Sequence, residues 1–166
     1  MLNLDRINAW SDTEAHAAFL HCCGSTSWAG QLTVRRPFAE EADLLAAAEQ
    51  AWQGLSRQDW LEVFAAHPKI GAVKSLRKKF ADIASWPAGE QAGVAGASDA
   101  VLRELAEANR QYEAKFGYIF IVSATGKSAA EMLALLRRRL DNDPEEEFEI
   151  AVLEQKKITS LRLQKL

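Results

Sequence analysis

Hydrophobic residues recur along this chain at the spacing of one face of an α-helix, with polar residues between them. Ala15, Phe19 and Cys22 share one such face. Ser11 and Glu14 precede them at the spacing of a capping box, which marks a helix start. The same combination of helical period with residues that begin or end helices predicts helices over about residues 11–24, 27–36, 39–53, 56–67, 98–116, 128–140 and from 143 toward the C-terminus.

Two segments depart from this helical period. Between residues 72 and 97, a short basic helix gives way to a stretch with three glycines from Gly89 to Gly96, which favours a loop or a broken helix. Residues 119–122 are β-branched and aromatic, but no second run offers a partner strand, so we expect an extended connector or a turn of buried helix. The pattern therefore predicts an all-α fold, a compact bundle of about seven or eight helices.

Length and composition narrow the class of protein. The 166 residues suit one domain, 1–166, and 48% hydrophobic with 26% charged residues is ordinary for a globular chain. The net charge is −3 with acids and bases interleaved, which argues against a nucleic-acid partner. The longest apolar run, residues 118–122, is too short for a membrane span, and no secretory signal is visible at the N-terminus. We therefore expect a cytoplasmic protein, with its adjacent Cys22 and Cys23 reduced.

One stretch breaks the even distribution of charge. Residues 69–79 contain five basic side chains and no acid. They form either a solvated helix face or a positive rim that attracts a small anion.

His67 is the first candidate for chemistry, because Pro68 forces the preceding helix to stop there. Imidazole is the natural proton carrier near neutral pH. Spacing alone does not separate a catalytic histidine from one that interacts with the helix dipole at a C-terminus. Glu90 and Arg162, taken singly, also occupy positions that a helix dipole favours.

Two further motifs carry little functional signal. Gly126-Lys127-Ser128 resembles the end of a phosphate loop, but Ile121 stands where that motif requires glycine. In the segment 21–23, His-Cys-Cys, neighbouring helical positions point in different directions and cannot easily share one ion. We therefore predict no metal site.

Several blocks distributed over nearly the whole chain resemble one known family. They are residues 23–29 (CGSTSWA), 36–38 (RPF), 67–71 (HPKIG), 90–93 (EQAG), 116–120 (FGYIF), 126–128 (GKS), 142–145 (NDPE), 154–159 (EQKKIT) and 161–163 (LRL). In this order they are similar to 2-oxo-4-hydroxy-4-carboxy-5-ureidoimidazoline (OHCU) decarboxylase. That resemblance implies an all-α homodimer that removes carbon dioxide from OHCU to form (S)-allantoin in urate degradation, without a metal or an organic cofactor.

The resemblance also implies a set of site residues. His67, Glu90 and Arg162 match the family's catalytic histidine, glutamate and arginine. The matching substrate-binding positions are Pro68, Ser85, Pro87, Phe116, Gly117, Tyr118, Ile119 and Phe120. Pro87 departs from the family pattern, in which many relatives have serine, and Ser85 is the nearby residue that could supply the missing hydroxyl.

These residue types suit the implied reaction. The imidazole would remove the substrate's hydroxyl proton, the carboxylate would bind ureido N–H groups and direct a proton to one face, and the guanidinium would contact a carbonyl. The alternative is a non-catalytic helical module that binds a small anionic purine derivative. The two hypotheses differ in whether the protein accelerates the formation of optically active allantoin.

Overall fold

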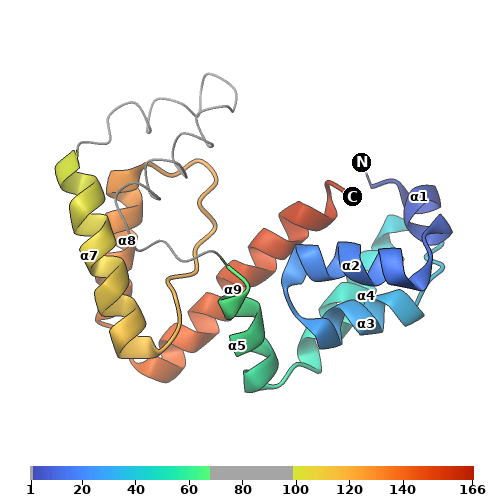
Figure 1. Ribbon diagram of the computed structural model, residues 1–166, viewed down its shortest axis with the longest axis horizontal. Helices are drawn as coiled ribbons and strands as arrows, with labels where there is room; N and C mark the ends of the chain where they lie inside the picture. Colours follow the sequence, from blue (N-terminus) through green and yellow to red (C-terminus); the bar gives the residue numbers. More distant parts are fainter. Residues whose placement is uncertain (1, 68–98) are drawn as a thin grey trace. The chain divides into compact units, whose positions relative to one another are not determined.

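The computed structural model describes residues 2–67 and 99–166, and the regular secondary structure in these two ranges is helical (Figure 1). The helices described are α1 (Leu4–Ala9), α2 (Asp12–Cys23), α3 (Thr26–Val34), α4 (Glu41–Gln53), α5 (Arg57–Ala65), α7 (Asp99–Phe116), α8 (Ala129–Leu140) and α9 (Pro144–Leu163). The predicted all-α class is confirmed. The chain divides into two compact units, residues 1–67 with 152–166 (unit 1) and residues 68–151 (unit 2). The single domain over 1–166 stays a prediction.

Several helices begin where the sequence predicted, because a serine closes the first turn. The hydroxyls of Ser11, Ser56 and Ser128 each accept a bond from the backbone N–H three residues later. The carboxylate of that third residue accepts the serine's own N–H. Hydrogen bonds from the Ser11 hydroxyl and N–H lower the pKa of Glu14, and those from the Ser128 N–H and hydroxyl lower the pKa of Glu131. These capping boxes fix the starts of α2, α5 and α8.

Two elements, α1 and the end of α5, differ from the prediction. α1 was not predicted, because its six residues are too few to show a helical period. Its N-cap is the side chain of Asn3. α5 ends at Ala65 with Ala66 as its C-cap, so His67 follows the helix and is not its last residue. Residues 119–122 form the predicted connector.

The core of unit 1 is built around Trp28, whose side chain is fully buried. Its ring meets Phe19 edge-on at 6.3 Å between centroids and stacks on Trp52 at 5.9 Å. Its indole N–H donates to the Ala48 carbonyl at 3.1 Å, so burial leaves no unsatisfied donor on the ring. These contacts join α2, α3 and α4.

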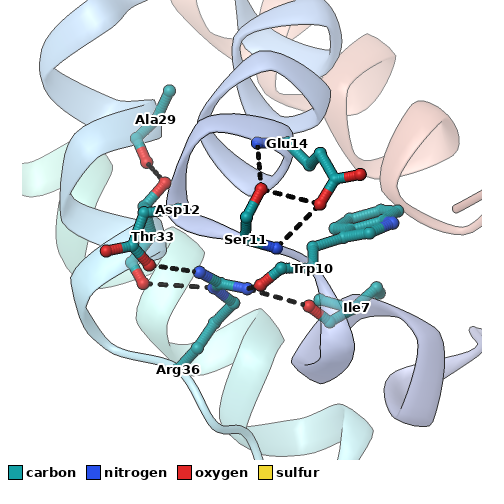
Figure 2. Close-up of polar contacts among 8 residues, drawn as sticks. All are labelled: Ile7, Trp10, Ser11, Asp12, Glu14, Ala29, Thr33 and Arg36. Carbon is teal, nitrogen blue, oxygen red and sulfur yellow. Dashed lines mark hydrogen bonds and ion pairs between the residues drawn. The ribbon is translucent and has the colours of Figure 1, made fainter.

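Arg36 fastens α1 and α2 to the end of α3 (Figure 2). Its Nη1 donates to the backbone carbonyls of Ile7, at 3.2 Å, and Trp10, at 2.5 Å. Its Nη2 pairs with Asp12 at 2.6 Å, and its Nε donates to the Thr33 carbonyl. Because the five guanidinium donors are fixed in one plane, a single side chain can hold three segments in register.

A buried ion pair organises unit 2. Arg139 bonds Glu147 Oε1 through Nε at 2.7 Å and through Nη2 at 2.5 Å. The Glu147 side chain is fully buried, and it also accepts bonds from the Tyr112 hydroxyl and from Asn142 Nδ2. Arg139 Nη1 donates to the Ile121 carbonyl at 2.6 Å. The network therefore joins α7, α8 and the start of α9 to the connector that follows α7.

Candidate functional site

Gly24 brings the C-terminal ends of α2 and α5 into close contact. Its φ of +88° ends α2 in a left-handed conformation that glycine adopts without strain. A Cβ at this position would stand 2.8 Å from the Cβ of Ala66, the residue before His67. Thr26 on α3 adds a second tie to α5, since its hydroxyl donates to Glu62 at 2.6 Å. Gly24 and Thr26 thus hold the end of α5, which His67 follows, close to the end of α2 and the start of α3.

His67 is held by the fully buried side chain of Gln155 on α9. Its Nε2 lies 2.5 Å from Gln155 Oε1, and its backbone N–H donates to the Phe64 carbonyl at 3.3 Å. The Gln155 amide nitrogen donates to Thr159 Oγ1 at 3.2 Å and to the Cys23 carbonyl at 3.4 Å. His67 is therefore connected through one amide group to the carbonyl end of α2.

Arg162 reaches the same end of α2. It lies seven residues after Gln155, close to two helical turns, so both side chains project from one face of α9. Its Nη1 donates to the carbonyls of His21, at 3.4 Å, and Cys22, at 3.3 Å. A cation there is favoured, because the final carbonyls of a helix are unpaired and carry the negative end of its dipole. Within unit 1, the predicted catalytic residue Arg162 therefore contacts the last turn of α2 directly, and the predicted catalytic residue His67 is linked to the same turn through Gln155.

The two thiols beside these residues are not nucleophiles at neutral pH. Cys22 and Cys23 are both free and almost fully buried. Burial raises the pKa of Cys22 to about 11, despite the opposing charge of Arg162, and raises the pKa of Cys23 as well. The two neutral thiols are therefore buried side chains at the end of α2.

The predicted substrate-binding residues Phe116 to Phe120 belong to unit 2. Gly117, with a φ of +81°, ends α7 and turns the chain into the connector. The rings of Phe116, Tyr118 and Phe120 surround Tyr112, with centroids 4.6, 6.0 and 5.3 Å from its own. The Arg139 guanidinium lies 4.6 Å from the Phe120 ring centroid. The backbone of this segment is thus supported by the buried Arg139–Glu147 network.

Other predicted site residues lie outside the described residues. They are Pro68, Ser85, Pro87, Glu90 and the basic stretch 69–79. Their assignments stay predictions.

Sequence reasoning missed Gln155, Thr159 and the role of Gly24. The signal for Gln155 was available, because its spacing from Arg162 places both on one helix face. The closeness of Gly24 to Ala66 is a tertiary contact that no local pattern reveals. Glycine at a helix end predicts the left-handed turn but not what packs against it.

The described residues offer neither a metal site nor a membrane span. No group of three His, Cys, Asp or Glu side chains in residues 2–67 and 99–166 is placed to hold a metal ion. None of the helices described is long and apolar enough to cross a bilayer.

Comparisons with known proteins point to one family. The family model described as OHCU decarboxylase matches residues 8–164. A 2-oxo-4-hydroxy-4-carboxy-5-ureidoimidazoline decarboxylase from Amia calva is 31% identical over 137 residues, 82% of this chain and 75% of that protein. The "uric acid degradation bifunctional protein TTL" of Arabidopsis thaliana is 42% identical over 146 residues, which cover 87% of this chain. The chain spans less than half of that longer relative, since the match covers 45% of it.

A solved structure gives the same result. A crystal structure of OHCU decarboxylase in the presence of (S)-allantoin matches with 37% sequence identity and a TM-score of 0.72. The match covers 94% of this chain and 97% of the other.

Proposed function

Because this chain belongs to the OHCU decarboxylase family, we propose that it removes carbon dioxide from OHCU and releases (S)-allantoin in urate degradation. The observation that carries the proposal is that His67, through Gln155, and Arg162, directly, are both tied to the carbonyls of the last turn of α2, in a chain that the family model matches from residue 8 to residue 164. A proton carrier and a cation with several N–H donors are the groups that this reaction needs.

The reaction requires no external electron acceptor, because the substrate contains its own. When the bond to the carboxylate breaks, its electron pair forms a carbon–carbon double bond, and the pair of the neighbouring carbon–nitrogen double bond moves to nitrogen, which takes up a proton. The hydroxyl then loses its proton as a carbonyl forms, and the ureido-bearing carbon gains one. The protein must orient the substrate, move protons and offset negative charge.

We assign these tasks to three residues. His67 hydrogen-bonds the hydroxyl and the departing carboxylate and takes the hydroxyl proton. Glu90 binds ureido N–H groups and directs the new proton to one face of the carbon, which sets the S configuration. Arg162 donates to a ring or ureido carbonyl and offsets the negative charge that develops in the transition state. The assignment is supported for His67 and Arg162 by their links to the same helix end and by the family resemblance, and for Glu90 by the family resemblance.

The remaining substrate contacts are proposed for the segment Phe116 to Phe120, together with Pro68 and with Ser85 or Pro87. The packing of this segment around Tyr112 supports a pocket wall whose backbone groups have fixed positions. No cofactor or metal enters the proposed mechanism.

Circular dichroism tests the activity directly. OHCU is generated enzymatically from urate, the protein is added, and the appearance of optically active allantoin is followed against spontaneous decay, which gives a racemic product. We expect a faster reaction that yields one enantiomer. If allantoin raises the melting temperature of the protein while the rate and the racemic outcome stay at background, the chain is instead a binding module for a small anionic purine derivative.

We also propose that the chain forms a homodimer and acts in the cytoplasm. The family resemblance supports the dimer, and the two buried free thiols suit a reducing compartment. Sedimentation equilibrium should give twice the monomer mass of 18.4 kDa. A mass of one chain at assay concentrations would contradict the dimer, and accumulation of a tagged full-length protein in an oxidising compartment would contradict the location.

A further inference from the structure

Gln155 has the position of a group that controls His67. Its side chain has no exposed surface, and neither has that of Thr159, one helical turn later on α9. Its amide contacts three groups: Nε2 of His67, the hydroxyl of Thr159 and the carbonyl of Cys23. A buried amide with partners on both its ends cannot rotate without losing bonds.

The partners determine which way the amide points. The Cys23 carbonyl oxygen can only accept a hydrogen bond, so the NH₂ group of Gln155 must face it. The opposite orientation would bring two oxygen atoms together and would leave the carbonyl end of α2 without this donor. The oxygen of Gln155 therefore faces His67, 2.5 Å from Nε2.

An amide oxygen cannot donate, so the hydrogen of this bond must belong to His67 Nε2. We propose that Gln155 is a positioning residue that holds neutral His67 in the tautomer protonated at Nε2, so that Nδ1 is the nitrogen that exchanges a proton with the substrate. This inference rests on the proposed function, in which His67 carries the proton. Nδ1 takes the hydroxyl proton as the new carbonyl forms, and the imidazolium then gives that proton from Nδ1 to the ureido-bearing carbon, on the face that Glu90 selects.

The choice of an amide over a carboxylate has a consequence for this step. A carboxylate beside Nε2 would favour the charged imidazole and raise the pKa of His67, whereas a neutral amide orients the ring without adding a charge. The bond to the Cys23 carbonyl also ties the orientation of the ring to the end of α2, where Arg162 of α9 donates to the Cys22 carbonyl.

The first test uses the unaltered protein. Long-range proton–nitrogen NMR spectra distinguish protonated from unprotonated imidazole nitrogens, and the His67 signals are identified by their loss in His67→Gln. In the neutral form we expect Nε2 to be protonated and Nδ1 to be unprotonated. A neutral His67 protonated at Nδ1, or an equal mixture of tautomers, would overturn the proposal.

The second test uses substitutions at residue 155. Gln155→Met keeps the length of the side chain and removes both polar ends, so we expect mixed tautomers and a kcat that falls about 10–100-fold, with KM changed less than about three-fold. Gln155→Glu keeps an acceptor for Nε2 and adds a charge. Its acidic limb in the pH profile of kcat/KM should move to higher pH, because the carboxylate raises the pKa of His67.

Gln164→Met is the matched control, because it makes the same substitution at an exposed position just after α9. It should leave kcat and the NMR spectrum of His67 unchanged. If Gln155→Met does not fold, the pH profile of Gln155→Glu and the NMR spectra of the unaltered protein still test the positioning role of Gln155. An unshifted pH profile in folded Gln155→Glu would contradict the proposal. If the unaltered protein has no decarboxylase activity, the proposed function is refuted. The NMR spectra test the role of Gln155 independently, because they report the tautomer of His67 whether or not the protein is active.

Discussion

Replacing Gly24 with alanine should disturb stability and catalysis together, because the glycine separates α2 from the residue before His67. The added Cβ would lie 2.8 Å from the Cβ of Ala66, well inside the ordinary carbon–carbon contact of about 3.5–4.0 Å. The substitution also places a side chain at a φ of +88°. Ala66 must move, and His67 must move with it.

Two effects contribute to the expected magnitude. The left-handed conformation costs about 1–2 kcal/mol for a residue with a Cβ, and forcing an extra carbon into packed space costs about 1–3 kcal/mol. We therefore expect the free energy of unfolding in urea to fall by about 2–5 kcal/mol, less than the ~5–15 kcal/mol that stabilises a typical domain. A folded fraction should remain for kinetics, with kcat reduced.

Two other glycines separate these effects. Gly126 has a φ of +73° and nothing within 4 Å of its added Cβ, so Gly126→Ala should show the conformational cost alone. Gly54 has a negative φ and only the Ala51 carbonyl nearby, at 3.7 Å, so Gly54→Ala should be close to neutral. In the double variant Gly24→Ala/Ala66→Gly, the Cβ overlap is absent and part of the stability should return. A Gly24→Ala protein within about 0.5 kcal/mol of the unaltered protein would refute this reasoning.

Three further predictions concern charged and titratable groups. Glu147→Gln should lower the free energy of unfolding by about 3–5 kcal/mol in urea titrations, because Arg139 is left buried without a counter-charge; a loss under about 1 kcal/mol would contradict this. Folding raises the pKa of Cys22 from 9.0 to about 11, so its contribution to stability is complete below pH 9.0 and is lost as the pH rises through that interval. Unfolding titrations across this range should show a shallower decline in Cys22→Ala, and an unchanged slope would be inconsistent with burial as the cause. Arg162→Lys keeps the charge but loses the planar donors, so kcat/KM should fall, and an unchanged value would show that donor geometry is irrelevant.

Much of the fold was predictable because its signals are local. The capping boxes mark three helix starts, at Ser11, Ser56 and Ser128. Each capping box joins a serine to the acidic residue three positions later, so four consecutive residues are enough to predict it. The end of α5 was placed two residues late, because Pro68 restricts only the residue before it, whereas the helix had already ended at Ala65.

The site was only partly predictable, because its decisive contacts join residues far apart in the chain. His67 and Arg162 were predicted from resemblance, and their links to the end of α2 depend on Gln155 and on the backbone of residues 21–23. Every residue has a backbone carbonyl, so the sequence does not indicate which carbonyls of α2 accept hydrogen bonds from Gln155 and Arg162. The same holds for Arg139, which contacts the carbonyl of Ile121.

The central claim is that His67 carries the proton in a decarboxylation, and the most direct test is kcat for folded His67→Ala in the circular dichroism assay. Positioned proton transfer typically contributes ~10²–10⁴-fold, so kcat should fall by that factor while the far-ultraviolet spectrum and the melting transition stay those of a folded protein. A folded His67→Ala protein that forms (S)-allantoin at the unaltered rate would contradict the account.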